Sequence, residues 1–188
     1  TMPYNPNGFP TPEEAQNEVT SIAIYDQAGD SRYVWVLDKE GVVQDTEQVI
    51  SCNDEYTLLQ KFLHKYNEIQ PTIITGWNID FFDIPYLYNR MCHILGERKA
   101  RALSPINDVI WLKHRNRYRI SGVACLDYMA LYKNFTYTEE SSYSLEAISQ
   151  KELGRGKIKY DGDLNDLMRA DINKYVDYNM NDVDLVVE

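Results

Sequence analysis

The 188-residue sequence lacks any run of about 18 apolar residues, the length that a membrane-spanning helix requires. Its first residues also lack the basic start and the apolar stretch of a secretory signal peptide. Cysteine is scarce, because only Cys52, Cys92 and Cys125 occur, widely spaced and without a cysteine or histidine at metal-ligand spacing. These absences argue against a membrane protein, a disulfide-stapled secreted protein and a zinc site. They predict a soluble cytoplasmic protein with reduced, buried thiols.

Basic residues are also few. Lysine and arginine number 19 against 29 aspartate and glutamate residues, which gives a net charge of -10. A protein that holds nucleic acid by bulk electrostatics normally carries a basic excess, so this class is disfavoured. The charge is uneven, however, because residues 98–101 and 113–119 are basic while residues 12–55 and 161–188 are acidic. Such a distribution is typical of an acidic metal site flanked by basic contacts, although a charge run can also be a solvated surface.

Hydrophobic patterning predicts one α/β domain over residues 1–188, with a mixed sheet flanked by helices. Hydrophobic residues make up 44% of the chain, and tyrosine alone occurs 15 times, so a real core is expected. Proline-rich residues 1–16 are expected to form an extended loop. The remaining elements are strands at residues 18–25, 33–37, 42–43 and 72–77, a β-hairpin within residues 109–126, a helix capped by Asn53 and stopped by Pro71, a helix around Pro85 ended by Gly96, a helix at 145–153 capped by Ser142 or Ser144, and one or two helices within 164–188.

One candidate for chemistry is Asp83, which follows the expected buried strand and begins the next helix. Open α/β sheets place their sites at the carboxyl ends of strands, which favours a functional role. Aspartate is also a common helix N-cap, so a purely structural role for Asp83 remains open.

The second candidate is the pair Tyr178 and Asp182 in the last helix. A spacing of four residues places both side chains on one helical face, and an apolar stripe nearby predicts that Asp182 lies near the buried edge. A buried carboxylate requires a partner or a metal ion. The alternative is that Asp182 is a solvent-exposed acid like Asp177 and Asp184.

The sequence around these residues resembles two exonuclease motifs of family B DNA polymerases. The second motif, Asn-x-x-x-Phe-Asp followed by Pro-Tyr, is similar to GWNIDFFDIPYLYNR at residues 76–90, and the third, Tyr-x-x-x-Asp, is similar to residues 178–182. The segments ILGERKARALSPI, SGVACLDYMALYKNF and SYSLEAISQKELGRGKIKYDG resemble the polymerases of T-even-type phages and their marine relatives. The resemblance covers nearly the whole chain. It implies the 3′→5′ proofreading exonuclease domain of a larger polymerase, working in a bacterial or phage-infected cell.

This resemblance implies an RNase H-like fold in which two divalent metal ions, Mg²⁺ or Mn²⁺, sit among four carboxylates and hydrolyse the 3′ end of single-stranded DNA. By that resemblance, Asp83 and Asp182 are metal ligands, Tyr178 orients the attacking water, and Asn78 and Phe82 hold the frayed 3′ end. The basic segment resembles a shortened form of the family's strand-partitioning hairpin. Its DNA-contacting residues would be Lys113, Arg115, Arg117 and Arg119. The implied partners are the 3′ end of DNA and the polymerase domains of the same full-length chain.

The family's first motif, Asp-x-Glu on the central strand of the sheet, is missing from these residues. Asp38-Lys39-Glu40 matches the Asp-x-Glu pattern, but it is followed by Gly41 and is predicted to form a turn. We therefore expect the sheet either to gape at its centre or to be completed by a strand from elsewhere, including strand exchange in a homodimer. We also expect the 188 residues alone to be inactive. Two alternatives stay open, a non-catalytic DNA-binding or structural piece and a free-standing RNase H-like exonuclease.

No polymerase signature of the Asp-x-x-Ser-Leu-Tyr-Pro-Ser or the Tyr-Gly-Asp-Thr-Asp type occurs in the 188 residues. These residues by themselves are therefore not expected to synthesise DNA.

Overall fold

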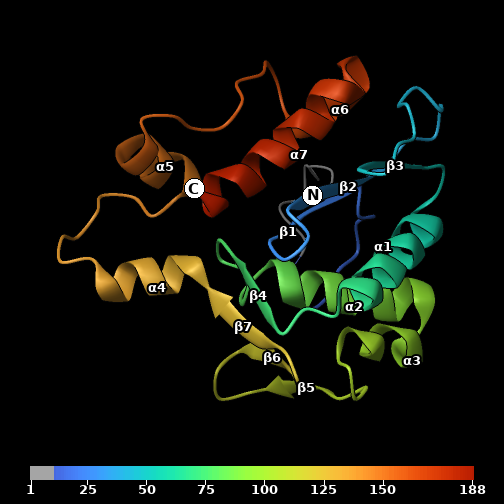
Figure 1. The fold of residues 1–188 in the computed structure, drawn as a ribbon, viewed down its shortest axis with the longest axis horizontal. Coiled ribbons are helices and arrows are strands. Elements are labelled where there is room, and N and C mark those ends of the chain that lie inside the picture. Colours follow the sequence, from blue (N-terminus) through green and yellow to red (C-terminus); the bar gives the residue numbers. More distant parts are fainter. Residues whose placement is uncertain (1–10) are drawn as a thin grey trace.

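A computed structural model describes residues 11–188, in which groups of strands and groups of helices follow one another along the chain (Figure 1). The α/β class predicted from the sequence is confirmed. In chain order the elements are β1 (Ser21–Asp26), β2 (Ser31–Leu37), β3 (Val49–Cys52), α1 (Glu55–Ile69), β4 (Ile73–Gly76), α2 (Asp83–Leu95), α3 (Glu97–Ala100), a 3₁₀ turn (Arg101–Leu103), β5 (Val109–Leu112), β6 (Arg117–Ile120), β7 (Ala124–Asp127), α4 (Tyr128–Phe135), α5 (Leu145–Leu153), α6 (Leu164–Ala170) and α7 (Ile172–Val187).

The strands form three small groups within residues 11–188, in the order β1-β2-β3, β4-β7 and β5-β6. β1 pairs antiparallel with β2, whereas β3 lies parallel to β2 and β4 lies parallel to β7. Strand directions are therefore mixed, as the sequence predicted. No described strand joins β1 to β4, and residues 11–16 contain a turn rather than a strand. The rest of the expected N-terminal loop, residues 1–10, lies outside the described part.

Two strand predictions are wrong. The third strand was expected at residues 42–43, but β3 begins at Val49 and runs parallel to β2. Parallel pairing requires the chain to cross back, and residues 38–48 make that crossing as a loop. The strand around residues 72–77 was expected to be buried, yet Ile73 in β4 is 58% exposed.

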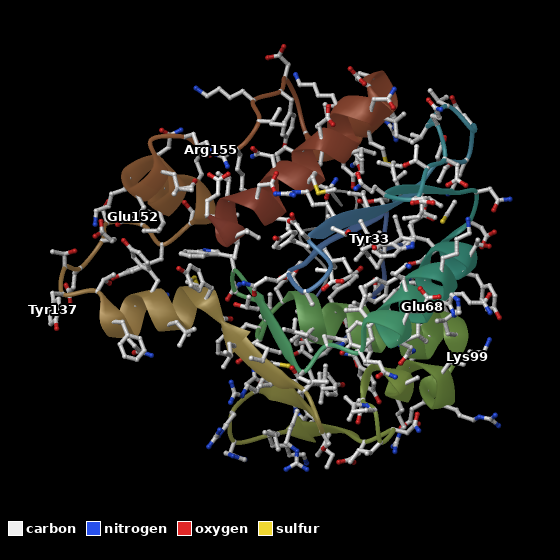
Figure 2. All side chains as sticks on the ribbon, viewed as in Figure 1. Tyr33, Glu68, Lys99, Tyr137, Glu152 and Arg155 are labelled. Carbon is white, nitrogen blue, oxygen red and sulfur yellow. The ribbon has the colours of Figure 1, made fainter. Side chains whose placement is uncertain are left out.

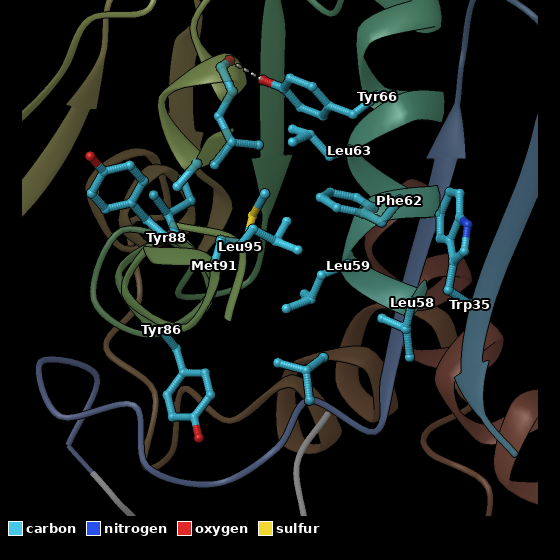
Figure 3. Close-up of a cluster of buried hydrophobic side chains, with 14 of the residues drawn as sticks. Trp35, Leu58, Leu59, Phe62, Leu63, Tyr66, Tyr86, Tyr88, Met91 and Leu95 are labelled. Atoms are coloured by element: carbon cyan, nitrogen blue, oxygen red, sulfur yellow. Dashed lines mark hydrogen bonds between the residues drawn. The ribbon is translucent and has the colours of Figure 1, made fainter. Parts of the chain in front are cut away.

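Side-chain alternation along β2 divides the core into two layers. Trp35 and Leu37 lie on the side covered by α1 and α2, while Val34 and Val36 lie on the side covered by α6 and α7. In the first layer, the rings of Trp35 and Phe62 meet edge to face with their centroids 5.4 Å apart, and Figure 3 shows the apolar face of α1 between β2 and α2. The β1-β2-β3 sheet is thus covered by helices on both faces, which supports the predicted RNase H-like architecture.

Helix ends follow the local chemistry of the sequence. Asp54, not Asn53, caps α1 by accepting a hydrogen bond from the Thr57 amide. Gly96 ends α2 as predicted, and Ser144 is the cap of α5 because its hydroxyl accepts from the Ala147 amide. The segment after residue 164 forms two helices, α6 and α7.

Across residues 11–188, no helix combines the length and the apolar character needed to cross a membrane. All three cysteines are free thiols, and burial raises the pKa of Cys52 to about 11. Cys52 is buried as predicted, whereas Cys92 and Cys125 are only partly buried.

Candidate functional site

Asp83 is the first residue of α2, just beyond the loop of residues 77–82 that leaves the carboxyl end of β4. Phe82 occupies the N-cap position, and no side chain caps this helix, so the purely structural N-cap role for Asp83 is wrong. The residue keeps an exposed surface, yet protein atoms crowd its carboxyl group. Burial raises the pKa of Asp83, the negative charge of Asp127 raises it further, and the positive charge of Lys157 opposes the rise. Asp83 therefore lies in a group of interacting charges.

Tyr178 and Asp182 lie on one face of α7 and share a cation, Lys157. The Lys157 ammonium donates to an Asp182 carboxylate oxygen at 2.7 Å and to the Tyr178 hydroxyl at 3.2 Å. Asp182 is partly buried, so the alternative of a solvent-exposed acid is wrong. Burial raises the pKa of Asp182 even though Lys157 lowers it, which means that the carboxylate is held charged at some cost in stability.

Lys157 is the functional candidate that the sequence did not reveal. Burial lowers its pKa, but the negative charge of Asp182 and the hydrogen bonds outweigh burial, and the net shift is upward. It lies in the loop between α5 and α6, which contains Gly154, Gly156 and Gly162. Lys157 forms an ion pair with Asp182, and its positive charge also lowers the pKa of the Asp83 carboxyl, so it acts electrostatically on both predicted carboxylates.

Asp127 is a second residue that was not predicted. It ends β7, caps α4, and is buried with 5% of its surface exposed. Its carboxylate accepts from the amides of Asp80 at 3.2 Å and Ala130 at 3.1 Å, so it holds the loop next to Asp83. The rule that sites gather at the carboxyl ends of parallel strands could have found Asp127, because β7 pairs with β4.

The residue types fit a divalent cation of the Mg²⁺ or Mn²⁺ kind. One carboxylate oxygen of Asp182, Oδ1, is buried and has no hydrogen-bond partner among the described residues, which leaves a hard oxygen ligand free. Asp83 provides a second carboxylate in the same charge group. Within residues 11–188, however, three or more acidic, histidine or cysteine side chains do not come together as a ready-made metal cage. A cation held here would need further ligands besides Asp83 and Asp182.

Asn78 and Phe82 border this site from the loop between β4 and α2. Asn78 has a left-handed backbone with φ of 62°, a conformation that asparagine tolerates better than most residues. The Phe82 ring stacks on Tyr86 at a centroid distance of 5.9 Å and is partly exposed. Their roles at a DNA 3′ end stay predictions.

The basic hairpin is formed by β5 and β6, as predicted. Lys113 and Arg115 are exposed at its tip, and side chains ending in nitrogen fan out around β5 and β6 in Figure 2. Arg119 is also exposed and lies 3.7 Å from Asp108. Arg117 differs from these residues, because its guanidinium turns inward and pairs with the buried carboxylate of Asp80.

The residues that match the Asp-x-Glu pattern, 38–40, form a turn, as predicted from the sequence. The Asp38 carboxylate is buried and accepts from the amides of Gly41 at 2.9 Å and Val43 at 2.7 Å and from the Ser51 hydroxyl at 3.2 Å. Burial raises its pKa, but these hydrogen bonds outweigh burial and leave the pKa below its ordinary value of 3.8. The carboxylate organises the loop between β2 and β3.

We expect Asp38→Asn to destabilise the protein by about 1–2 kcal/mol at pH 7, because an amide leaves part of this acceptor set unmatched. The folded pKa of Asp38 lies below the unfolded one, so its stabilising effect is present above pH 3.8 and is lost as the pH falls further. Urea denaturation of both proteins at pH 7 and at pH 3 measures this. Equal differences at both pH values would contradict the assigned role of the charge.

A family described as DNA polymerase family B, exonuclease domain, matches residues 3–148. The chain belongs to this family. The match covers more than half of the chain, and it confirms both the resemblance drawn from the sequence and the RNase H-like expectation for the mixed α/β structure.

Two phage relatives of this family B exonuclease domain align with almost the whole chain. The DNA-directed DNA polymerase of Escherichia phage RB69 is 34% identical over 98% of this chain and 24% of its own length. That of Enterobacteria phage T4 is 34% identical over 95% of this chain and 23% of its own length. The catalytic polypeptide of DNA polymerase epsilon from Saccharomyces cerevisiae is 30% identical over 62% of this chain and 5% of its own length. The chain spans about a quarter of the length of the two phage relatives.

Proposed function

We propose that these residues form the 3′→5′ proofreading exonuclease domain of a DNA polymerase, acting on the 3′ end of single-stranded DNA. One observation carries the proposal. In a chain of this family, the predicted ligand Asp182 has a buried carboxylate oxygen without a partner among the described residues, beside Tyr178 and Lys157. A buried and unpaired carboxylate oxygen costs folding stability, so its retention favours a ligand-binding role.

Each residue has a chemical task in this proposal. Lys157 donates to the Tyr178 oxygen, so the phenolic proton is left to orient a water molecule or a phosphate oxygen. That water attacks the terminal phosphodiester, and the bond from phosphorus to the 3′ oxygen breaks, which releases a nucleoside monophosphate and leaves a new 3′ hydroxyl. The ammonium of Lys157 also favours the negative charge that develops on the phosphate.

Asp83 and Asp182 would hold a divalent cation together with carboxylates from outside these 188 residues. When bound, Mg²⁺ or Mn²⁺ supplies positive charge to the attacking and the leaving oxygen. Asn78 and Phe82, on the loop that borders Asp83, would hold the terminal nucleotide, Phe82 by offering a ring for stacking. The exposed Lys113, Arg115 and Arg119 of the hairpin would contact phosphates.

The names of the relatives suggest the wider setting. Both phage relatives are DNA-directed DNA polymerases, and this chain matches about a quarter of the length of each. We therefore propose that the domain works beside polymerase domains of one polypeptide, in the cytoplasm of a bacterial or phage-infected cell.

The test follows the length of a 5′-labelled single-stranded oligonucleotide in Mn²⁺. Two proteins are compared, the 188-residue chain and the same chain preceded by an Asp-x-Glu segment of the family. We expect shortening from the 3′ end by the extended protein only, since it alone has all four carboxylates. EDTA should stop the shortening.

A 3′-phosphorylated oligonucleotide serves as the control, because a blocked end should slow an exonuclease but not an endonuclease. Internal cuts, or shortening that persists in EDTA, would contradict the proposal. Binding of the oligonucleotide without any shortening in the extended protein would instead support a non-catalytic DNA-holding piece.

A further inference from the structure

The loop of residues 77–82 is tightly folded and leads directly to Asp83. The Phe82 amide donates to the Asn78 carbonyl at 3.3 Å, and the Ile84 amide donates to the Ile79 carbonyl at 3.0 Å. Small displacements of this loop would therefore move Asn78, Phe82 and the start of α2 together.

Asp80 is the buried charge of this loop, with 4% of its surface exposed. Its backbone amide donates to Asp127 at 3.2 Å, which fixes the loop to the end of β7. Its side chain pairs with Arg117 of β6, and the remaining carboxylate oxygen has no partner among the described residues. A carboxylate buried to this degree is tolerable only with a cation, so Arg117 is required where it stands.

Arg117 belongs to the hairpin, and the hairpin has its own attachment to α2. The Tyr118 ring lies 4.7 Å from the Tyr88 ring between centroids, and the Tyr118 hydroxyl donates to Asn89 at 2.7 Å. Two neighbouring residues of β6 thus bind two different parts of the body, Tyr118 the middle of α2 and Arg117 the loop before it. A movement of the hairpin would therefore also move the loop of residues 77–82.

We propose that Arg117 and Asp80 are a positioning pair that links the hairpin to the loop carrying Asn78 and Phe82. DNA that displaces the hairpin would shift the loop that holds the terminal nucleotide, and a seated nucleotide would fix the hairpin. Arg117 then acts through Asp80 and not by touching DNA, unlike Lys113 and Arg115 at the tip. The link rests on the proposed exonuclease function for its purpose, but the pair itself can be tested without DNA.

The three tryptophans allow a direct measurement, because each lies in a different part of the molecule. Trp77 is in the loop, where its ring nitrogen donates to the Tyr143 carbonyl at 3.0 Å, and Trp111 is in the hairpin. Trp35 is in the core and reports whether the protein remains folded. With 5-fluorotryptophan in place of tryptophan, fluorine NMR gives one signal for each position.

The decisive variant is Arg117→Met, and Lys113→Met is its matched control because it removes one positive charge from the exposed tip of the same hairpin. Without DNA, we expect Arg117→Met to shift or broaden the Trp77 signal and to leave Trp35 unchanged. Lys113→Met should change neither signal. Arg117→Lys, which keeps the charge but not the fork of donors, should restore the Trp77 signal in part.

A titration with an eight-nucleotide thymidine strand in EDTA tests the link to DNA. In the unmodified protein the strand should shift Trp111 and Trp77 together, and Arg117→Met should weaken binding about tenfold. Lys113→Met should weaken binding less and should keep the two shifts together.

Identical Trp77 signals in Arg117→Met and Lys113→Met without DNA would overturn the positioning role. Tenfold weaker binding with an unchanged Trp77 signal would also overturn it, since Arg117 would then be a direct DNA contact. If Arg117→Met loses the Trp35 signal by unfolding, Arg117→Lys makes the same comparison. If the thymidine strand does not bind even the unmodified protein, the proposed function fails, while the DNA-free comparison still decides the positioning pair.

Discussion

Asp182→Ala is expected to reduce 3′ shortening by the extended protein at least about a thousandfold, because the loss of a metal ligand removes several kcal/mol of transition-state stabilisation. The structure adds a second reason. Lys157 forms an ion pair with Asp182. Without this carboxylate, the ammonium loses the negative charge that holds it beside α7. The initial rate of oligonucleotide shortening in Mn²⁺ measures the effect.

Asp177→Ala is the matched control for this variant. Asp177 lies on the same helix five residues earlier, and it is exposed to solvent. The rate should stay within about twofold, since a surface aspartate outside the site contributes little. If Asp182→Ala and Asp177→Ala gave equal rates, Asp182 would have no part in catalysis and the site would have to be placed elsewhere.

Glu55→Ala is expected to lower the free energy of unfolding by about 3–5 kcal/mol, the largest stability loss that the ion pairs of the structure suggest. The Glu55 carboxylate accepts from Arg90 at 2.8 Å and 2.7 Å and from the Val19 amide at 2.6 Å. The side chains of Glu55 and Arg90 are only 9% and 14% exposed. Alanine would leave the Val19 amide without its acceptor and the Arg90 guanidinium without its counter-charge, so that Arg90 keeps only the Ala15 and Gln16 carbonyls. This loss costs far more than the pair itself contributes.

Urea denaturation compares Glu55→Ala with Glu97→Ala. Glu97 also pairs with an arginine, Arg101, at 2.7 Å, but the two side chains are 63% and 44% exposed. This exposed pair should contribute less than about 0.5 kcal/mol. Equal losses in the two variants would contradict the view that burial makes the Glu55 pair important.

Local signals in the sequence predicted local structure well. Gly96 ends α2 and Ser144 caps α5, because both outcomes depend on backbone geometry and a hydrogen bond within three residues. The hairpin around residues 113–116 and the exposure of its tip followed from composition in the same way. The placement of Asp83 at the start of a helix and of Asp182 within the last helix was predicted for the same reason, because both depend on local sequence patterns.

Features that depend on distant contacts could not be predicted in this way. Lys157 reaches Asp182 across 25 residues of chain, and nothing in its own loop indicates that partner. Arg117 resembled its basic neighbours in the sequence, yet a buried carboxylate 37 residues away draws it inward. The parallel pairing of β3 with β2 also depends on the crossing loop that Asp38 organises, and a strand pattern does not specify direction.

The parallel pairing of β4 with β7 has a consequence for how quickly the molecule can assemble. Thr75 and Leu126, which share a hydrogen bond across this pair, are 51 residues apart in the chain. Each doubling of a closed loop adds only about 0.6 kcal/mol of entropy, but such contacts form slowly because the intervening chain must first collapse. The hairpin and α2 lie within that intervening chain and can fold locally. We therefore expect the acidic centre at the ends of these two strands to be among the last parts of the molecule to form during folding.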